Sequence, residues 1–127
     1  MELNKRYIDY AVEKTLELLR IDSPTGYTRE AALWVKDAFA ALGYPAKITN
    51  KGAVLVTFDP PVEPSGEGAV IFEAHTDTLG AMVAQIKEDS RLRVTKIGGL
   101  SANNVEAENA RIHTRDGRIY EGTFQLI

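Results

Sequence analysis

The sequence contains no cysteine, and its two histidines are His75 and His113. The lack of cysteine excludes disulfides, thiolate metal sites and a cysteine nucleophile, and it is compatible with a reducing cytoplasm. Any transition-metal site in this chain must therefore be built from histidine and carboxylate ligands, and histidine is scarce.

Basic charge and long apolar runs are also lacking. The net charge is −3, which leaves no basic surface for nucleic acid. No apolar run approaches the ~20 residues that a membrane-spanning helix needs, and residues 1–6 lead into an amphipathic pattern rather than the core of a signal peptide. With 127 residues, the chain is long enough for one domain with a real core. We expect a cytoplasmic protein that binds neither nucleic acid nor membrane.

The first third of the chain has the apolar spacing of helices. This spacing predicts an amphipathic helix over residues 5–20, with Asn4 as its N-cap. The Ser-Pro-Thr-Gly sequence at residues 23–26 interrupts the pattern, because a residue before proline avoids helical angles and glycine permits a tight turn. A second helix is predicted to begin after its N-cap, Thr28, and to end at Gly43.

From residue 46 onward the apolar period changes to two. Alternation, or a short apolar run, predicts strands over residues 46–49, 53–58, 69–74, 82–87, 92–97, 110–114 and 119–124. Residues 59–68 are rich in proline and glycine and are interpreted as a surface loop, whereas Asp116-Gly117 predicts a hairpin turn. The fold class is therefore α/β: residues 1–80 begin a layer of sheet and helices, and residues 81–127 form a small antiparallel β barrel or sandwich.

His75 and Asp77 directly follow the apolar run at residues 69–74, which reads as a buried strand. In open α/β sheets, ligands and catalytic groups gather at the carboxyl ends of strands. A neutral imidazole is a good zinc ligand, and a nearby carboxylate can fix which ring nitrogen faces the metal. The same pattern also fits a turn histidine that simply pairs with an aspartate at the end of a strand.

Three other features are given structural interpretations. Asp22 and Thr25 are read as structural residues of the Ser-Pro-Thr-Gly turn, and His113 is read as an exposed residue of a strand. The three arginines between residues 111 and 118 are assigned to a solvated β face, although they are also placed to contact a neighbouring subunit.

The chain resembles the N-terminal part of the M42 metallo-aminopeptidases, the glutamyl aminopeptidase or tetrahedral aminopeptidase family. The resemblance follows the order and spacing of several segments along nearly the whole chain. These segments are residues 18–26, 75–83, 98–99, 104–109, 114–117 and 120–123.

The resemblance implies a mixed sheet flanked by helices, with an inserted β domain. Residues 1–80 would belong to the catalytic domain, and residues 81–127 to a β-rich insertion that supports a cytoplasmic homo-oligomer. Two divalent metal ions, zinc or cobalt, would share a bridging water and act on peptide substrates, removing the N-terminal residue. His75 would be a direct metal ligand, and Asp77 the catalytic-site carboxylate that orients the imidazole. A metal lowers the pKa of the water, and a glutamate takes its proton.

The chain departs from the family pattern in one respect. In the family, the bridging aspartate, a pair of glutamates, a further carboxylate and a second histidine all follow the β insertion, whereas this chain stops at Ile127. Catalytic zinc normally takes three protein ligands, so His75 alone is not expected to hold a metal tightly. We therefore expect an N-terminal portion of a longer protein, inactive by itself. The alternative is a non-catalytic β module that mediates protein–protein assembly.

Overall fold

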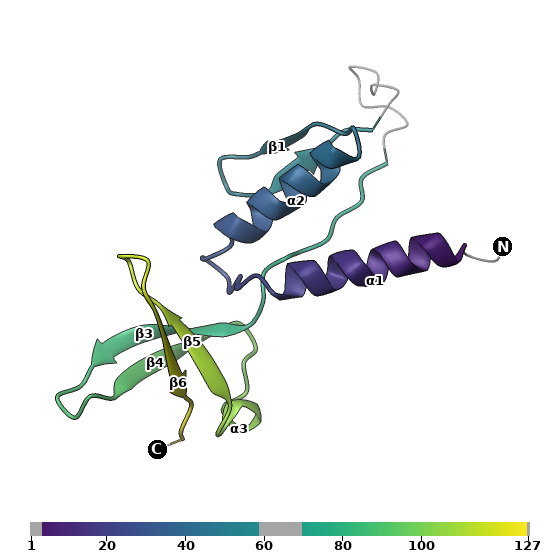
Figure 1. Ribbon diagram of the computed structural model, residues 1–127. Helices are drawn as coiled ribbons and strands as arrows, with labels where there is room; N and C mark the ends of the chain where they lie inside the picture. The colour runs from purple at the N-terminus through teal and green to yellow at the C-terminus, as the bar shows by residue number, and fades with distance from the viewer. Residues whose placement is uncertain (1–3, 59–69, 127) are drawn as a thin grey trace. The chain divides into compact units, whose positions relative to one another are not determined.

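The computed structural model describes residues 4–58 and 70–126, and they divide into two compact units, Met1–Thr78 and Leu79–Ile127 (Figure 1). In the part of the chain that is described, every helix is too short or too polar to cross a membrane. The loop expected over residues 59–68 lies outside the described residues.

The first unit begins with helix α1 (Lys5–Leu19), close to its predicted bounds. The side chain of Asn4 accepts a hydrogen bond of 3.0 Å from the backbone N–H of Arg6. The predicted N-cap is therefore confirmed, because this bond satisfies one of the N–H groups that the first turn leaves without a partner. Lys14 and Glu17, one turn apart, form an ion pair at 2.9 Å that adds a small stabilisation.

Helix α2 (Arg29–Ala41) carries the buried apolar side chains of this unit, Ala31 and Ala32. Thr28 precedes the helix as predicted, but its side chain makes no capping hydrogen bond. At the other end Gly43 adopts φ +87° and donates its N–H to the carbonyl of Ala40. This is the left-handed terminator that glycine supplies at helix ends, so the predicted C-terminal cap is confirmed.

A small antiparallel hairpin packs against α2. Its strands are β1 (Ala46–Ile48) and β2 (Val54–Val56). The ring of Phe58 lies edge-on to the ring of Tyr44, with centroids 5.0 Å apart, and edge-on to Phe39 at 6.1 Å. These aromatic contacts join the end of the hairpin to the end of the helix.

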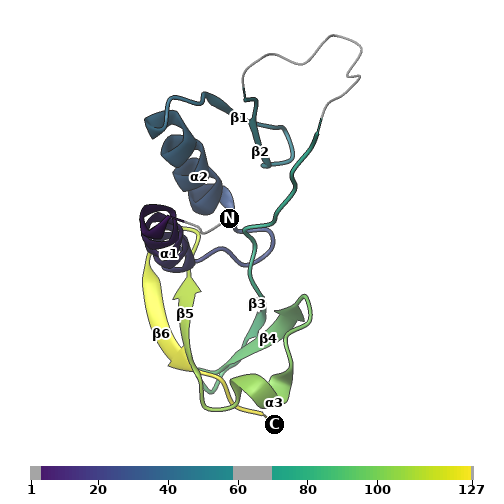
Figure 2. The same cartoon turned by 90° about the vertical axis from the view of Figure 1, so that its right-hand side faces the viewer.

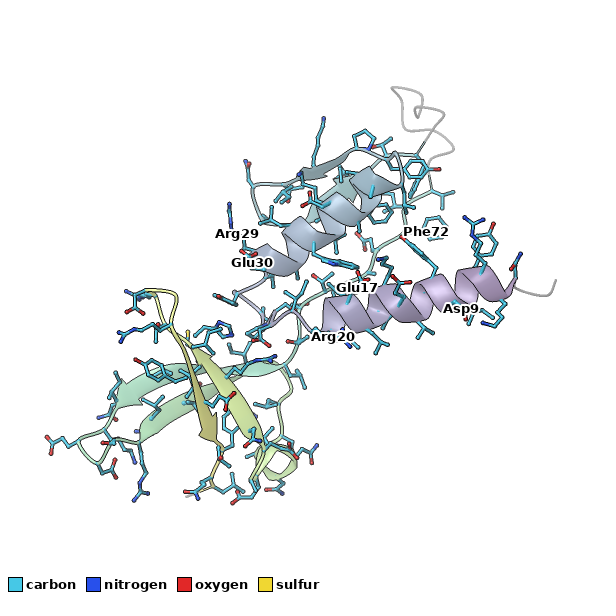
Figure 3. All side chains as sticks on the ribbon, in the orientation of Figure 1. Asp9, Glu17, Arg20, Arg29, Glu30 and Phe72 are labelled. Atoms are coloured by element: carbon cyan, nitrogen blue, oxygen red, sulfur yellow. The ribbon has the colours of Figure 1, made fainter. Side chains whose placement is uncertain are left out.

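The strand predicted over residues 69–74 is wrong for the residues that are described, 70–74. They are assigned to no strand, and Val70, Ile71 and Phe72 are between 76% and 90% exposed. Figure 3 labels Phe72, the most exposed of the three. A strand exists only when another backbone pairs with it, and β1 and β2 pair with each other instead. The apolar run therefore has the composition of a buried strand. Among the described residues, however, no neighbouring strand covers it.

In the second unit, β3 (Gly80–Ile86) pairs with β4 (Leu92–Ile97), and β5 (Asn109–His113) pairs with β6 (Ile119–Thr123). All four strands lie within two residues of their predicted bounds. The short helix α3 (Ala102–Val105) was not predicted, since four residues are too few to show a helical period.

Of the expected barrel or sandwich, the barrel is not observed in the described part of the chain. Within the described residues, the two hairpins of this unit are separate two-stranded sheets, which Figure 2 shows as distinct ribbons. A barrel requires every strand to be hydrogen-bonded on both sides, and here each strand has one partner. The fold of the described chain is therefore a mixed α/β structure with small antiparallel sheets.

The predicted turn at Asp116-Gly117 is confirmed, and a compact polar cluster closes it. The guanidinium of Arg118 donates to Asp116 Oδ2 at 2.7 and 2.8 Å, and the hydroxyl of Thr114 donates to Asp116 Oδ1. These hydrogen bonds, that of Arg118 first, lower the pKa of Asp116 below its ordinary value. Gly117 adopts φ +81° and donates its N–H to the carbonyl of Thr114.

Replacing Gly117 by alanine should destabilise this hairpin by roughly 1 kcal/mol, because a Cβ disfavours the left-handed backbone region. No atom lies within 4 Å of the added Cβ, so the cost is conformational rather than steric. Amide hydrogen exchange in β5 and β6 should become roughly fivefold faster. Gly99→Ala is the matched control, because Gly99 has no positive φ and equally open surroundings. Equal effects of the two substitutions would contradict this explanation.

Asp116→Asn should remove a pH-dependent part of the hairpin's stability. The folded pKa of Asp116 lies below its unfolded value, so the stabilisation is fully present above the ordinary aspartate pKa. It is lost as the pH falls through the lowered folded pKa. Hydrogen exchange in β6 should therefore be faster in the variant at neutral pH and should converge with the original protein in strong acid. A difference that persists unchanged in acid would refute this assignment.

The apolar run should promote self-association, because a contiguous exposed apolar surface without strand partners favours pairing with another chain. Replacing Ile71 and Phe72 by serine should lower the fraction of associated protein in sedimentation velocity. Ile86→Ser is the control, since Ile86 is 77% exposed but stands between Gln85 and Lys87. If the control reduces association equally, exposure alone rather than the run is responsible.

Candidate functional site

The candidate site lies in the first unit, where the chain after the apolar run meets the Ser-Pro-Thr-Gly turn. The backbone N–H of Thr78 donates to the carbonyl of Ser23 at 2.9 Å, and that of Thr25 donates to the carbonyl of Thr78 at 3.3 Å. These bonds form a parallel bridge between Pro24 and Thr78. The hydroxyl of Ser23, a residue only 2% exposed, adds a bond of 2.8 Å to the carbonyl of Thr76.

The local sequence explains why the turn can make this bridge. Pro24 disfavours helical angles at Ser23, and the carbonyl of Ser23 accepts the N–H of Thr78 instead of a helical partner. The carbonyl of Pro24 accepts the N–H of Tyr27 at 2.7 Å, and Gly26 between them adopts φ +92°. The tight turn therefore separates α1 from α2 and pairs with residues 76–78.

His75 and Asp77 are in direct contact. Nδ1 of His75 lies 3.0 Å from Asp77 Oδ1 and 3.0 Å from the backbone oxygen of Asp77. Both of these oxygens are acceptors, so we assign the proton of the neutral imidazole to Nδ1. The lone pair then resides on Nε2, and the side chain of His75 is 85% exposed. This is the arrangement in which a histidine can coordinate a metal through Nε2.

Asp77 is held from its other side by Thr25. The hydroxyl of Thr25 donates to Asp77 Oδ2 at 2.6 Å, so the two carboxylate oxygens have different partners. The pKa of Asp77 lies below its ordinary value. The hydrogen bond from Thr25 is the largest cause, partial burial opposes it, and the electrostatic interaction and hydrogen bond with His75 lower it further. Asp77 is therefore an ionised acceptor suited to orient the imidazole.

The described residues fit part of a metal site. They contain no group of three or more histidines, cysteines, aspartates and glutamates that could hold a metal ion. His75 offers one nitrogen ligand, while both oxygens of Asp77 are engaged by His75 and Thr25. His113 lies on β5, in the strand where it was expected, but it is half-buried rather than exposed. One ligand is fewer than the three that catalytic zinc normally takes from protein.

The link from Thr25 to Asp77 was missed by sequence reasoning, which treated Thr25 as a structural residue of the turn. The two residues are 52 positions apart, and no spacing rule joins them. The signal available in the sequence was the hydroxyl side chain of Thr25 in the Ser-Pro-Thr-Gly turn. It could have been paired with the acceptor Asp77 only if the turn had been expected to lie beside residues 75–77.

Comparison with known proteins gives a consistent assignment. The M42 glutamyl aminopeptidase family matches residues 52–127, a range that includes His75 and Asp77. The chain is 36% identical over 120 residues to a protein of Bacillus subtilis named "Putative aminopeptidase YhfE", covering 91% of this chain and 34% of that protein. It is 28% identical over 106 residues to the glutamyl aminopeptidase of Lactococcus lactis, covering 84% of this chain and 29% of that protein.

The chain thus spans about a third of the length of these curated relatives. The family match covers more than half of the chain, and the relatives align along most of it. These matches, together with the contact between His75 and Asp77, lead to one conclusion: the chain belongs to the M42 glutamyl aminopeptidase family.

Proposed function

We propose that this chain contributes one metal ligand, His75, and its orienting carboxylate, Asp77, to a metal-dependent aminopeptidase that removes N-terminal residues from peptides. The observation that carries the proposal is the imidazole held at Nδ1 by two acceptor oxygens, with Nε2 accessible. Membership of the M42 family and the names of the relatives support the reaction class.

The roles of the residues follow from this contact. Asp77 keeps the proton on Nδ1, so that the Nε2 lone pair of His75 is directed away from the carboxylate. The negative charge of Asp77 also raises the basicity of the imidazole, which makes Nε2 a stronger ligand for a cation. A divalent ion such as zinc or cobalt would supply the Lewis acidity that lowers the pKa of a water and polarises a peptide carbonyl.

We infer that the remaining ligands and the general base come from outside these 127 residues. The support is the single ligand found among the described residues and the length of the relatives, about three times that of this chain. On this proposal, residues 1–80 belong to the catalytic domain and residues 81–127 to a β-rich insertion that supports a cytoplasmic homo-oligomer. The 127-residue chain by itself is then inactive.

The proposal predicts weak zinc binding at His75 and no peptide hydrolysis by the purified chain. Adding zinc should shift the imidazole resonances of His75 in NMR spectra, with a midpoint far above stoichiometric concentration, because one ligand binds weakly. His75→Ala should abolish the response, and His113→Ala should leave it intact. Aminoacyl nitroanilides should remain uncleaved with zinc or cobalt present.

Two results would contradict this proposal. The first is that zinc shifts the imidazole resonances of His113 instead of His75, or shifts neither. This result would rule out His75 as the ligand and favour the alternative of a non-catalytic assembly module. Hydrolysis of the nitroanilides by the 127-residue chain, lost on His75→Ala, would show that the chain already completes a catalytic site.

A further inference from the structure

The side-chain contact between Thr25 and Asp77 joins two segments whose other contacts at this site all involve backbone. The backbone of Thr25 is already anchored, because its N–H donates to the carbonyl of Thr78 at 3.3 Å. The neighbouring Ser23 is anchored through both its carbonyl and its hydroxyl. The hydroxyl of Thr25 is therefore not needed to dock the turn, and its bond of 2.6 Å to Asp77 calls for another role.

Packing does not fix the orientation of the imidazole. The side chain of His75 is 85% exposed, so its ring depends on hydrogen bonds at Nδ1. The carboxylate of Asp77 turns about a soft terminal torsion, and an oxygen held by His75 alone would leave that torsion loosely defined. A second partner on Oδ2 fixes the carboxylate plane and thereby the position of Oδ1.

We propose that Thr25 is a positioning residue for His75: its hydroxyl orients the Asp77 carboxylate, which keeps the imidazole proton on Nδ1 and Nε2 available to a cation. The inference rests on the proposed function for the role of the cation. The hydrogen-bond chain itself, from Thr25 through Asp77 to His75, is defined without one.

Four substitutions separate this role from a structural one. Thr25→Val removes the hydroxyl and keeps both the shape and the backbone N–H, and Thr25→Ser restores the hydroxyl. Thr28→Val is the matched control, because it makes the same chemical change three residues away on a side chain that caps nothing. Ser23→Ala removes a docking bond of the turn without touching the carboxylate.

The measurement is the tautomer of His75 in the metal-free chain, read from long-range ¹⁵N–¹H NMR in alkaline solution, at a pH where its ring resonances no longer change. The original protein, Thr25→Ser and Thr28→Val should all show the proton predominantly on Nδ1. Thr25→Val should shift the ratio toward the Nε2–H tautomer by roughly threefold to tenfold. It should also weaken the zinc response of His75 by a similar factor.

The proposal is overturned if Thr25→Val leaves the tautomer ratio unchanged, or if Ser23→Ala or Thr28→Val changes it equally. Amide protection of Thr78 reports whether the turn stays docked in each variant. If Thr25→Val loses this protection, the proposal makes two requirements. Thr25→Ser must keep the original tautomer ratio, and Ser23→Ala must leave the ratio unchanged even where the turn is undocked. A shifted tautomer with no zinc response at His75 in any variant would refute the proposed function and leave the positioning role standing.

Discussion

The parallel bridge between Pro24 and Thr78 determines where the candidate site lies. It is made of two backbone hydrogen bonds, and the buried hydroxyl of Ser23 reinforces it. The bridge brings a turn from the N-terminal region against a segment more than fifty residues later in the chain. His75 and Asp77 stand just before the bridge, and Thr25 stands within it. The geometry of the three side chains thus depends on a contact between backbones.

Features with local causes were predictable from the sequence, and features with distant partners were not. The N-cap Asn4, the glycine that ends α2 and the hairpin at Asp116-Gly117 each depend on residues within a few positions, and all were correctly expected. The strand over residues 69–74 and the closed barrel depend on pairing between distant segments. Composition predicted their burial but could not supply the neighbouring strands, which are absent from the described residues.

The site divides in the same way. The spacing of His75 and Asp77 made them candidates, and their direct contact is a short-range consequence of that spacing. The role of Thr25 depends on the placement of its turn beside Asp77, 52 residues later in the chain. The spacing of apolar residues, from which helices and strands were predicted, carries no information about that placement. Membership of the M42 family gives the wider context, and the ligand roles of His75 and Asp77 stay proposals that metal binding would test.

The segment that leads to His75 is fastened at one end. Thr78 is held by the bridge, whereas residues 70–74 pair with none of the described residues. If residues 70–74 also adopt conformations that displace His75, the apparent dissociation constant of a cation at Nε2 would be the intrinsic value divided by the competent fraction. A strand added alongside residues 70–74 would then tighten binding at His75 without contributing a ligand, so sheet completion and metal affinity would be thermodynamically coupled.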